Sequence, residues 1–554
     1  MNTPALGTAH AISLQGLEGT DVAIEATLLT GLPVFTMVGL ADTAVIEAKE
    51  RLRASFHNVG LGWPNQRLTV NLSPADTAKS GAGFALGIAA ATIGALGYGQ
   101  LPADTFLIGE LGLDGAVRGV RGVLPALLAA QKLGFRQAFV PEENKHEAEL
   151  VSGISVISIA NLAVLAAKLR VPGKLIAIPE AKTVPGSRRA VPGTTRAVPG
   201  KSSASLGKSA ASPSGSGAEE SFGNLSQLAA PVKNPAGDIS DVYGQEEAIW
   251  ALQIAAIGGH HTQMLGPPGV GKSMLAERFP TLLPPLAEVE AMEVAAIRSL
   301  CGVKITDLPR YRPFISPHHT ISVAALIGGG SGTPLPGAIT LAHRGVLYCD
   351  EFAEFPNSAI QSLRQPLEKG WIELQRTRAR LRYPAAFQLL AAANPCRCGM
   401  GPASAKCSCT SHDIRLYRRN LGGPIRDRID IRLQLRRPSR ADMRRGGSVS
   451  SKEAQAAVAA GIFRQRRRAA QDTLLPDTLQ NKDLPGKWLR QNTPWKGGAV
   501  KDLERHWQQG QLSLRGIDKI LRIAWSTADF FGHDFPHDED IAAACLLRGA
   551  EGII

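Results

Sequence analysis

The chain has 554 residues with 44% hydrophobic and 20% charged side chains, a length that exceeds one hydrophobic core and predicts about two to four domains. Seven cysteines in this length exclude a small disulfide-stapled scaffold. The net charge of +13 favours a polyanionic partner, most simply nucleic acid, and a basic solvated surface is the alternative. No run of roughly eighteen apolar residues and no basic-then-apolar leader is present, so we expect no membrane span and a cytoplasmic, reducing location.

Residues 1–171 are predicted to form one α/β domain. The segment "VRGVLPALLAAQKLGF" has helical spacing and closes with a glycine, and "RQAFVP" after it has the apolar character of a strand. From Val171 the composition changes, because the tripeptide VPG recurs and is followed by "KSSASLGKSAASPSGSG". Such a stretch cannot bury enough apolar surface to offset its ordering entropy, so residues 172–230 are predicted to be a flexible linker.

Residues 231–435 are predicted to form a second α/β core with a phosphate-binding loop. "GPPGVGKS" matches the pattern G-x-x-x-x-G-K-[ST] and stands between an apolar strand, "TQML", and a helix, "MLAERF". In this pattern backbone N–H groups surround the phosphates, the lysine reaches the β and γ phosphates, and the hydroxyl takes a position on Mg²⁺. A turn without a ligand is the alternative. The residues concerned are Gly266, Pro267, Pro268, Gly269, Val270, Gly271, Lys272, Ser273 and Met274.

Polar residues follow two further apolar strands. "GVLYCDE" ends in Asp350 and Glu351, an acid to hold Mg²⁺ and a carboxylate to polarise the attacking water. "FQLLAAANP" brings Asn394 to a strand end, where it can orient that water. "GPIRDRIDI" and "LSLRGIDKIL" supply Arg428 and Arg515, because arginine at a phosphoryl-transfer site stabilises the transition state. A solvated surface group is the alternative for each arginine.

In these motifs the chain resembles an AAA+ ATPase of the magnesium-chelatase-like branch. The segment "RPFISPHHTISVAALIGGGSGTPLPGAITLAHRGVLYCDE" carries the resemblance to that branch. "NPCRC" and "GPIRDRIDI" narrow the resemblance to the YifB/ComM family of bacterial proteins, along nearly the whole chain. The resemblance implies an N-terminal Lon-protease-like (ribosomal S5 domain 2-like) α/β domain, a P-loop AAA+ core of three αβα layers, and a C-terminal α-helical lid over residues 436–554, where helical spacing agrees. It also implies a homo-hexameric ring that holds ATP and Mg²⁺ between subunits.

The resemblance assigns roles to the residues of the core. Lys272 and Ser273 bind phosphate and Mg²⁺, and Asp350 binds Mg²⁺. Glu351 activates the attacking water, and Asn394 is sensor 1.

Further roles fall on residues outside the three strand ends. Arg428 is the arginine finger that acts on the ATP of a neighbouring subunit, with Arg426 as the competing candidate, because the family usually has leucine at that position. Arg515 is sensor 2. Val242 and Tyr243 belong to the segment that packs on the adenine.

The N-terminal domain lacks the groups that a Lon-type peptidase needs. The serine nucleophile lies between two glycines in the Lon pattern, where this chain has Ala82, and the lysine position holds Ala126. Lys79 and Ser80 are nearby, but adjacent loop residues are not a positioned dyad. We therefore expect a structural, docking or DNA-binding role, not peptide hydrolysis.

Two segments are candidates for DNA contact. "EKGWIELQRTRARLRYPAAF" predicts a hairpin whose tip carries Arg376, Arg378 and Arg380, and an insert carries His318 and His319. In a ring such arginines can grip a phosphate backbone independently of sequence, and a solvated basic turn is the alternative. We expect a DNA motor, a branch-migration helicase that promotes integration of DNA in homologous recombination or natural transformation. A chelatase-type ATPase that remodels a protein or metallocofactor complex is the alternative.

Four of the seven cysteines gather in one loop. Cys396, Cys398, Cys407 and Cys409 have the spacing C-x-C-x8-C-x-C, directly after Asn394. Four thiolates in two close pairs suit tetrahedral Zn²⁺, and free thiols are the alternative. We expect a structural zinc ion that stiffens this loop.

Overall fold

The computed structural model describes most of the chain. The described residues are 6–39, 43–74, 82–172, 237–330, 334–376, 379–401, 406–421, 423–445, 447, 449–476, 479–494, 497–510 and 512–549. Two compact units share the chain: Met1–Ser13, Thr20–Val120 and Leu127–Gly223 form one, and Leu14–Gly19, Arg121–Ala126 and Asn224–Ile554 form the other. Apart from residue 172, the expected linker over residues 172–230 lies outside the described residues.

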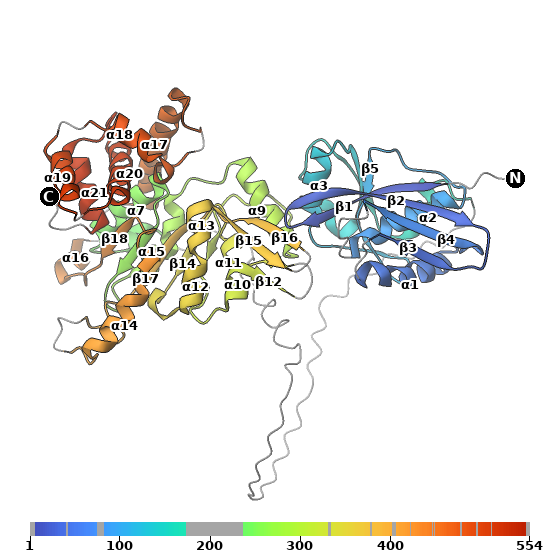
Figure 1. The fold of residues 1–554 in the computed structure, drawn as a ribbon, viewed down its shortest axis with the longest axis horizontal. Coiled ribbons are helices and arrows are strands. Elements are labelled where there is room, and N and C mark those ends of the chain that lie inside the picture. Colours follow the sequence, from blue (N-terminus) through green and yellow to red (C-terminus); the bar gives the residue numbers. More distant parts are fainter. Residues whose placement is uncertain are drawn as a thin grey trace, which may run out of the picture. The chain divides into compact units, whose positions relative to one another are not determined.

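The first unit is built on a seven-stranded mixed sheet, drawn in blue and cyan in Figure 1, in the order β3-β4-β2-β1-β5-β8-β9. β2 pairs with β4 in antiparallel fashion, whereas β5, β8 and β9 run parallel. The strands are β1 (Gly7–Gln15), β2 (Glu18–Leu29), β3 (Phe35–Val38), β4 (Arg67–Ser73), β5 (Thr105–Leu107), β8 (Gln137–Pro141) and β9 (Ser155–Ile159), with β6 (Glu110–Leu111) and β7 (Val117–Arg118) as a separate hairpin.

Helices alternate with these strands, which confirms the predicted α/β class. They are α1 (Thr43–Asn58), α2 (Ala85–Ala95), α3 (Val123–Lys132), α4 (Lys145–Ala148) and α5 (Leu162–Lys168). The helix and strand predicted from "VRGVLPALLAAQKLGF" and "RQAFVP" are confirmed as α3 and β8. α2 is buried over all of its 11 residues, and a Cβ on Gly87 would lie 2.7 Å from Ile24 Cδ1. Its small residues therefore allow the helix to lie directly on β2.

The two alanines at the Lon-type positions have ordinary structural surroundings. Ala82 begins the short turn η1 (Ala82–Phe84), and Ala126 is fully buried within α3. Lys79 and Ser80 lie outside the described residues. Neither alanine can supply a nucleophile or a base, so peptide hydrolysis through these two positions is chemically excluded.

The second unit is built on a five-stranded parallel sheet in the order β11-β14-β17-β10-β18. The strands are β10 (Thr262–Leu265), β11 (Phe314–Ile315), β14 (Val346–Cys349), β17 (Gln388–Ala393) and β18 (Ile431–Gln434). Every residue of β14 and β17 is buried, as expected for parallel strands covered on both faces. The strands predicted from "TQML", "GVLYCDE" and "FQLLAAANP" are confirmed.

Helices and two small hairpins surround this sheet. The helices up to residue 435 are α7 (Glu246–Gly258), α8 (Lys272–Arg278), α9 (Glu288–Leu300), α10 (Val323–Ile327), α11 (Ala338–Leu341), α12 (Asn357–Ser362), α13 (Arg364–Lys369), α14 (Ser411–Leu421) and α15 (Gly423–Arg426). The short helix α16 (Arg440–Arg445) follows within the range predicted for the lid. The hairpins are β12 (Gly328–Gly329) with β13 (Leu335–Pro336), and β15 (Trp371–Arg376) with β16 (Ala379–Pro384). These elements confirm the P-loop αβα core.

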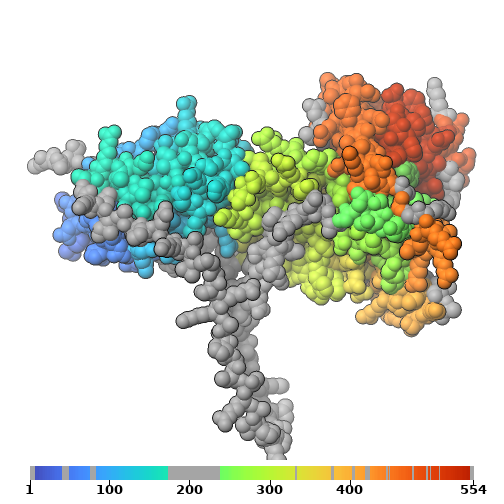
Figure 2. Space-filling model, turned by 180° about the vertical axis from the view of Figure 1, so that it is seen from behind, coloured from blue at the N-terminus to red at the C-terminus, as the bar shows by residue number. Residues whose placement is uncertain are grey.

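The C-terminal part is helical as predicted and is drawn in orange and red in Figures 1 and 2, and Figure 1 labels the green helix α7. Its helices are α17 (Ser451–Gln471), α18 (Gly486–Asn492), α19 (Gly498–Gln508), α20 (Leu514–Phe531) and α21 (Asp538–Arg548). α20 packs against α7, α17 and α21, and its Ile517 and Ile520 share one hydrophobic core with Ile249 and Leu252 of α7. Within the described part of the chain, no helix combines the length and the apolar character needed to cross a bilayer.

Candidate active site

Three neighbouring parallel strands end at one edge of the second sheet. The register pairs Cys349 of β14 with Ala391 of β17, and Ala393 of β17 with Leu265 of β10. The residues that follow these strands are Asp350, Asn394 and Gly266, which therefore meet at this edge. In parallel α/β sheets, ligands bind beyond the carboxyl ends of the strands.

The loop after β10 closes around the side chain of Lys272. Gly269 and Gly271 have φ values of 76° and 95°, which glycine adopts without strain. The ammonium of Lys272 donates to the carbonyl oxygens of Gly266 at 2.7 Å and Pro267 at 3.1 Å. Burial lowers the pKa of Lys272, while nearby carboxylates oppose that shift. An anionic phosphate in the loop would favour the charged ammonium in place of these neutral carbonyls.

Two pairs of side chains join the loop to the neighbouring strand ends. Ser273 Oγ donates to Asp350 Oδ2 at 3.1 Å, and Lys272 Nζ donates to Asn394 Oδ1 at 2.9 Å. A hydroxyl and a carboxylate at this separation are hard oxygen ligands of the kind that Mg²⁺ takes from a protein beside substrate phosphates. Ser273 and Asp350 therefore fit the predicted magnesium site.

Glu351 has an unusual backbone and an unpredicted partner. Its φ is 49°, in the left-handed region, and its carboxylate is half-exposed. Its Oε2 lies 3.1 Å from Nδ1 of His319, which comes from the segment between β11 and α10. His318 beside it is exposed and contacts Thr320 Oγ1 at 2.8 Å through its Nδ1. The sequence indicated both histidines only as DNA contacts and gave no sign that His319 meets Glu351.

Arg428 lies at the amino ends of the parallel strands, whereas the P-loop of the same chain lies at their carboxyl ends. β18 runs parallel to β10 with Ile431 opposite Thr262, and Arg428 precedes β18 at its amino end. The side chain is mostly buried and its guanidinium donates to Glu368. Arg426, the competing candidate, is exposed. The P-loop follows the carboxyl end of β10, so Arg428 and the P-loop of the same chain lie at opposite ends of neighbouring parallel strands.

Arg515 and the expected adenine segment lie on elements other than the three strands that end at the P-loop. Arg515 is exposed in the first turn of α20, which Ser513 caps by accepting from Gly516 N at 3.1 Å. A cation at this positive helix end is unfavourable unless an anion lies nearby. Val242 is buried in the core and Tyr243 is partly exposed.

Gln245, two residues further along, was not identified from the sequence. Its Nε2 donates to the carbonyl oxygens of Val270 at 3.3 Å and Arg436 at 2.7 Å. It thereby ties the segment containing Val242 and Tyr243 to the P-loop.

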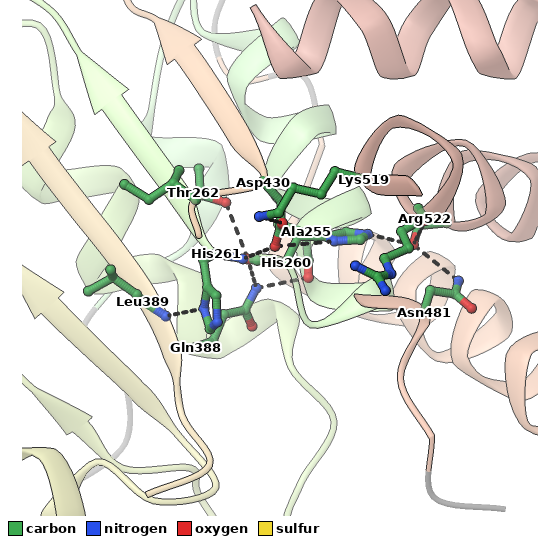
Figure 3. Close-up of polar contacts among 12 residues, drawn as sticks. Ala255, His260, His261, Thr262, Gln388, Leu389, Asp430, Asn481, Lys519 and Arg522 are labelled. Atoms are coloured by element: carbon green, nitrogen blue, oxygen red, sulfur yellow. Dashed lines mark hydrogen bonds and ion pairs between the residues drawn. The ribbon is translucent and has the colours of Figure 1, made fainter. Parts of the chain in front are cut away.

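A buried polar network joins the start of β18 to the lid (Figure 3). Lys519 Nζ donates to Asp430 Oδ1 at 2.7 Å, and both side chains are only 8% exposed. The N–H of His261 donates to Asp430 Oδ2 at 3.2 Å, and Arg548 donates to the Asp430 carbonyl at 3.2 Å. Burial raises the pKa of Asp430, but Lys519 and His260 outweigh it and hold that pKa well below its ordinary value.

The same network contains two neighbouring histidines. His261 Nδ1 accepts from the N–H of Leu389 at 3.1 Å, and burial lowers the pKa of His261 to about 3, so the ring is neutral. His260 Nε2 lies 2.8 Å from Ser526 Oγ, which also accepts from Asn481 at 3.1 Å. The lid helix α20 is thus bonded to the sheet through polar groups as well as apolar ones.

The hairpin predicted around the basic segment is confirmed as β15 and β16. Arg380 donates to Glu373 on the facing strand, yet 73% of its side chain is exposed. The guanidinium of Arg382 stacks 4.0 Å from the centre of the Trp371 ring. Arg378 and the side chain of Arg376 lie outside the described residues.

The four-cysteine loop adjoins the P-loop. The sulfur of Cys396 lies 3.4 Å from that of Cys398 and 3.8 Å from that of Cys407, and the latter two are 3.6 Å apart. The ligand atoms of all four cysteines, Cys409 included, lie within 4.8 Å of one another. Tetrahedral zinc with bonds of about 2.3 Å requires sulfurs about 3.8 Å apart, so this set fits zinc closely.

The protonation of the thiols and the position of the loop bear on what a metal ion would do here. Backbone N–H groups of Met400 and Ser408 lower the pKa of Cys398 to about 6, which favours one thiolate in the cluster. In Cys407 the N–H of Cys409 is outweighed by burial and by the neighbouring cysteines, which raise the pKa to about 11, so a bound cation would have to favour the remaining thiolates. A Cβ on Gly399 would lie 2.7 Å from Pro268 Cγ, so the cysteine loop touches the P-loop directly.

Sequence comparisons identify three families and several proteins that this chain resembles. Residues 238–443 match the family described as magnesium chelatase, subunit ChlI, residues 24–144 match subunit ChlI of Mg-chelatase, and residues 448–548 match the C-terminal region of that subunit. An uncharacterized protein of Mycobacterium tuberculosis is 40% identical over 552 residues, which are 98% of this chain and 99% of that protein.

Two named relatives also align over nearly their full length. The uncharacterized protein YifB of Escherichia coli is 32% identical over 560 residues, 99% of this chain and 98% of YifB. The competence protein ComM of Haemophilus influenzae is 33% identical over 549 residues, 98% of this chain and 97% of ComM.

Proposed function

Because the chain belongs to the YifB/ComM family of magnesium-chelatase-like AAA+ proteins, we propose that it is an ATP-hydrolysing motor that acts on DNA as a homo-hexameric ring. The observation that carries the ATPase proposal is the convergence of Lys272, Ser273, Asp350 and Asn394 at one sheet edge, with Glu351 adjacent. These are the groups that phosphoryl transfer needs, since catalysis there consists of positioning and charge stabilisation.

Each residue has a distinct task in this proposal. Lys272 exchanges its P-loop carbonyl partners for phosphate oxygens, and Asn394, which it releases, orients the water. Ser273 and Asp350 hold Mg²⁺, which neutralises charge on the phosphates. Glu351 accepts the proton of the water once it has left His319. Arg428 and Arg515 act on the phosphates of the neighbouring and the same subunit, respectively.

The positive net charge of the chain and the name of one relative favour DNA as the substrate. The chain has a formal net charge of +13, and Arg380 of the β15–β16 hairpin is mostly exposed. The relative from Haemophilus influenzae is named a competence protein, and a protein that processes DNA during natural transformation would fit that name. We propose branch migration that promotes integration of DNA in homologous recombination or natural transformation.

A second candidate comes from the matched families, which are described by a magnesium-chelatase subunit. On that reading the ATPase remodels a protein or metallocofactor complex, and DNA does not affect it. For the four-cysteine loop we propose a structural Zn²⁺ held by Cys396, Cys398, Cys407 and Cys409, which stiffens the loop against the P-loop.

The deciding experiment is ATP hydrolysis by the purified protein alone, with single-stranded DNA and with branched DNA, each at low and raised salt. Stimulation by DNA that fades with salt supports the motor, because phosphate contacts are weakened by salt. An ATPase indifferent to every DNA supports the remodeller. The Glu351→Gln variant is expected to bind ATP and to lose roughly 100-fold or more in hydrolysis, and full turnover in it would contradict the proposed site.

A further inference from the structure

A second group of metal-ligand residues lies in the lid, between the end of α20 and the first turn of α21. His533, His537 and Asp540 offer one ligand atom each, and these atoms lie within 4.8 Å of one another. The rings of His533 and His537 are stacked with their centroids 4.2 Å apart. Nothing in the ATPase proposal uses these three residues.

The carboxylate of Asp540 points to a missing partner. Asp540 is 1% exposed, and its Oδ2 accepts from the N–H of His537 and lies 2.8 Å from His533 Nδ1. Its Oδ1 is also buried, yet has no hydrogen-bond partner within the described ranges of the chain. A buried carboxylate oxygen without a donor is unfavourable, and a bound cation removes that penalty.

Several charged groups near the loop have partners, while Glu539 is exposed to solvent. Asp538 accepts from the N–H groups of Gly498 and Ala499, at the start of α19. Asp534 is 3.9 Å from Arg467, and Arg464 donates to the carbonyl of Asp529. In this loop, among the residues that the structure describes, Asp540 Oδ1 is the buried side-chain oxygen left without a donor.

Access and ligand type agree with a metal ion. His533 is partly exposed and His537 is exposed, so an ion can enter from solvent. Phe535 packs edge-on against His537 at 5.2 Å and Phe531 stacks on His533 at 6.0 Å, which restricts the orientations of both rings. Two imidazoles and one carboxylate form a ligand set that divalent zinc accepts, with water completing the shell.

We propose that His533, His537 and Asp540 bind one Zn²⁺-type transition-metal ion, which fastens the start of α21 to the end of α20. The competing interpretation is an ion pair between His533 and Asp540 that only caps α21. That interpretation leaves Asp540 Oδ1 unpaired and gives the ring of His537 no polar role. The site is independent of the proposed ATPase, because none of its ligands touches the P-loop or the cysteine loop.

The test uses full-length protein freed of metal by a chelator and then titrated with Co²⁺, with bound metal quantified by equilibrium dialysis. Cobalt on thiolates gives an intense sulfur-to-metal absorption band, whereas cobalt on two imidazoles and a carboxylate gives only weak ligand-field bands. We expect one equivalent without thiolate character, whatever the cysteine loop does. In His537→Gln and in Asp540→Asn its affinity should fall by about 10-fold or more, because each change removes a ligand.

The matched control is His57→Gln, which alters an exposed histidine of α1 in the first unit. It should leave the non-thiolate equivalent unchanged, and Zn²⁺ should raise the melting temperature of this variant and of the wild type more than that of His537→Gln. The proposal is overturned if the wild type binds no metal without thiolate character. It is equally overturned if His537→Gln and Asp540→Asn both bind that equivalent with wild-type affinity.

Discussion

The buried pair between Asp430 and Lys519 makes a quantitative prediction for Lys519→Met. Methionine retains the apolar stem of lysine, so the change removes the charge with little loss of packing. Asp430 Oδ1 then loses the donor at 2.7 Å, while Oδ2 keeps the N–H of His261 at 3.2 Å. Removing one partner of a buried ion pair costs about 3–5 kcal/mol, and the retained bond places this case near 3 kcal/mol.

The assay is chemical denaturation of the wild type, Lys519→Met, Asp430→Asn and the double variant. The double variant should be more stable than Lys519→Met alone, because the uncompensated carboxylate is gone. Arg515→Met is the matched control one turn earlier on α20, where the side chain is exposed, and it should change stability by less than about 0.5 kcal/mol. A loss below about 1 kcal/mol in Lys519→Met, or strict additivity in the double variant, would refute this reasoning.

Three further predictions concern the proposed ATPase site and the buried polar network around Asp430. His319→Gln should raise ATP hydrolysis without DNA by a few-fold, since it frees Glu351 at 3.1 Å, and an unchanged basal rate contradicts a restraining role. His261 is neutral with a pKa of about 3, below its unfolded value of 6.5, so its contribution is complete above pH 6.5 and declines as pH falls toward 3. Unfolding free energy should therefore drop by about 2 kcal/mol between pH 7 and pH 5 from this group, and His261→Gln should flatten that slope. Arg428→Ala should lower turnover by roughly 1,000-fold with ATP binding intact, and Arg426→Ala much less; the reverse order would assign the finger to Arg426.

The elements that the sequence predicted best depend on short-range patterns. The P-loop spacing, the apolar strands before Asp350 and Asn394, and the helical period of α20 are each written within a few consecutive residues. The contacts that were missed join residues far apart in the sequence. Asp430 and Lys519 are separated by 89 positions, and no local pattern indicates which buried lysine meets which aspartate.

His319 shows why residue roles were harder to predict than elements. Its place in a segment resembling the family insert indicated an exposed group, because nothing nearby in sequence demanded a carboxylate partner. The structure folds the segment between β11 and α10 back over the end of β14, where Glu351 begins a turn with φ of 49°. A contact of this kind depends on the path of a long connection, which periodicity does not encode.

The network in Figure 3 bears on how neighbouring sites in the proposed ring would influence each other. Arg428 lies two positions before Asp430, and Arg515 lies one helical turn before Lys519. Because Asp430 and Lys519 are bonded at 2.7 Å in a buried setting, the lid cannot tilt toward a phosphate at Arg515 without either moving the finger segment or breaking the pair. Breaking the pair costs about 3–5 kcal/mol, and we propose that the segment moves with the lid instead. ATP bound by one subunit would therefore shift the arginine offered to the next, and Lys519→Met should weaken that dependence even in preparations where the fold is retained.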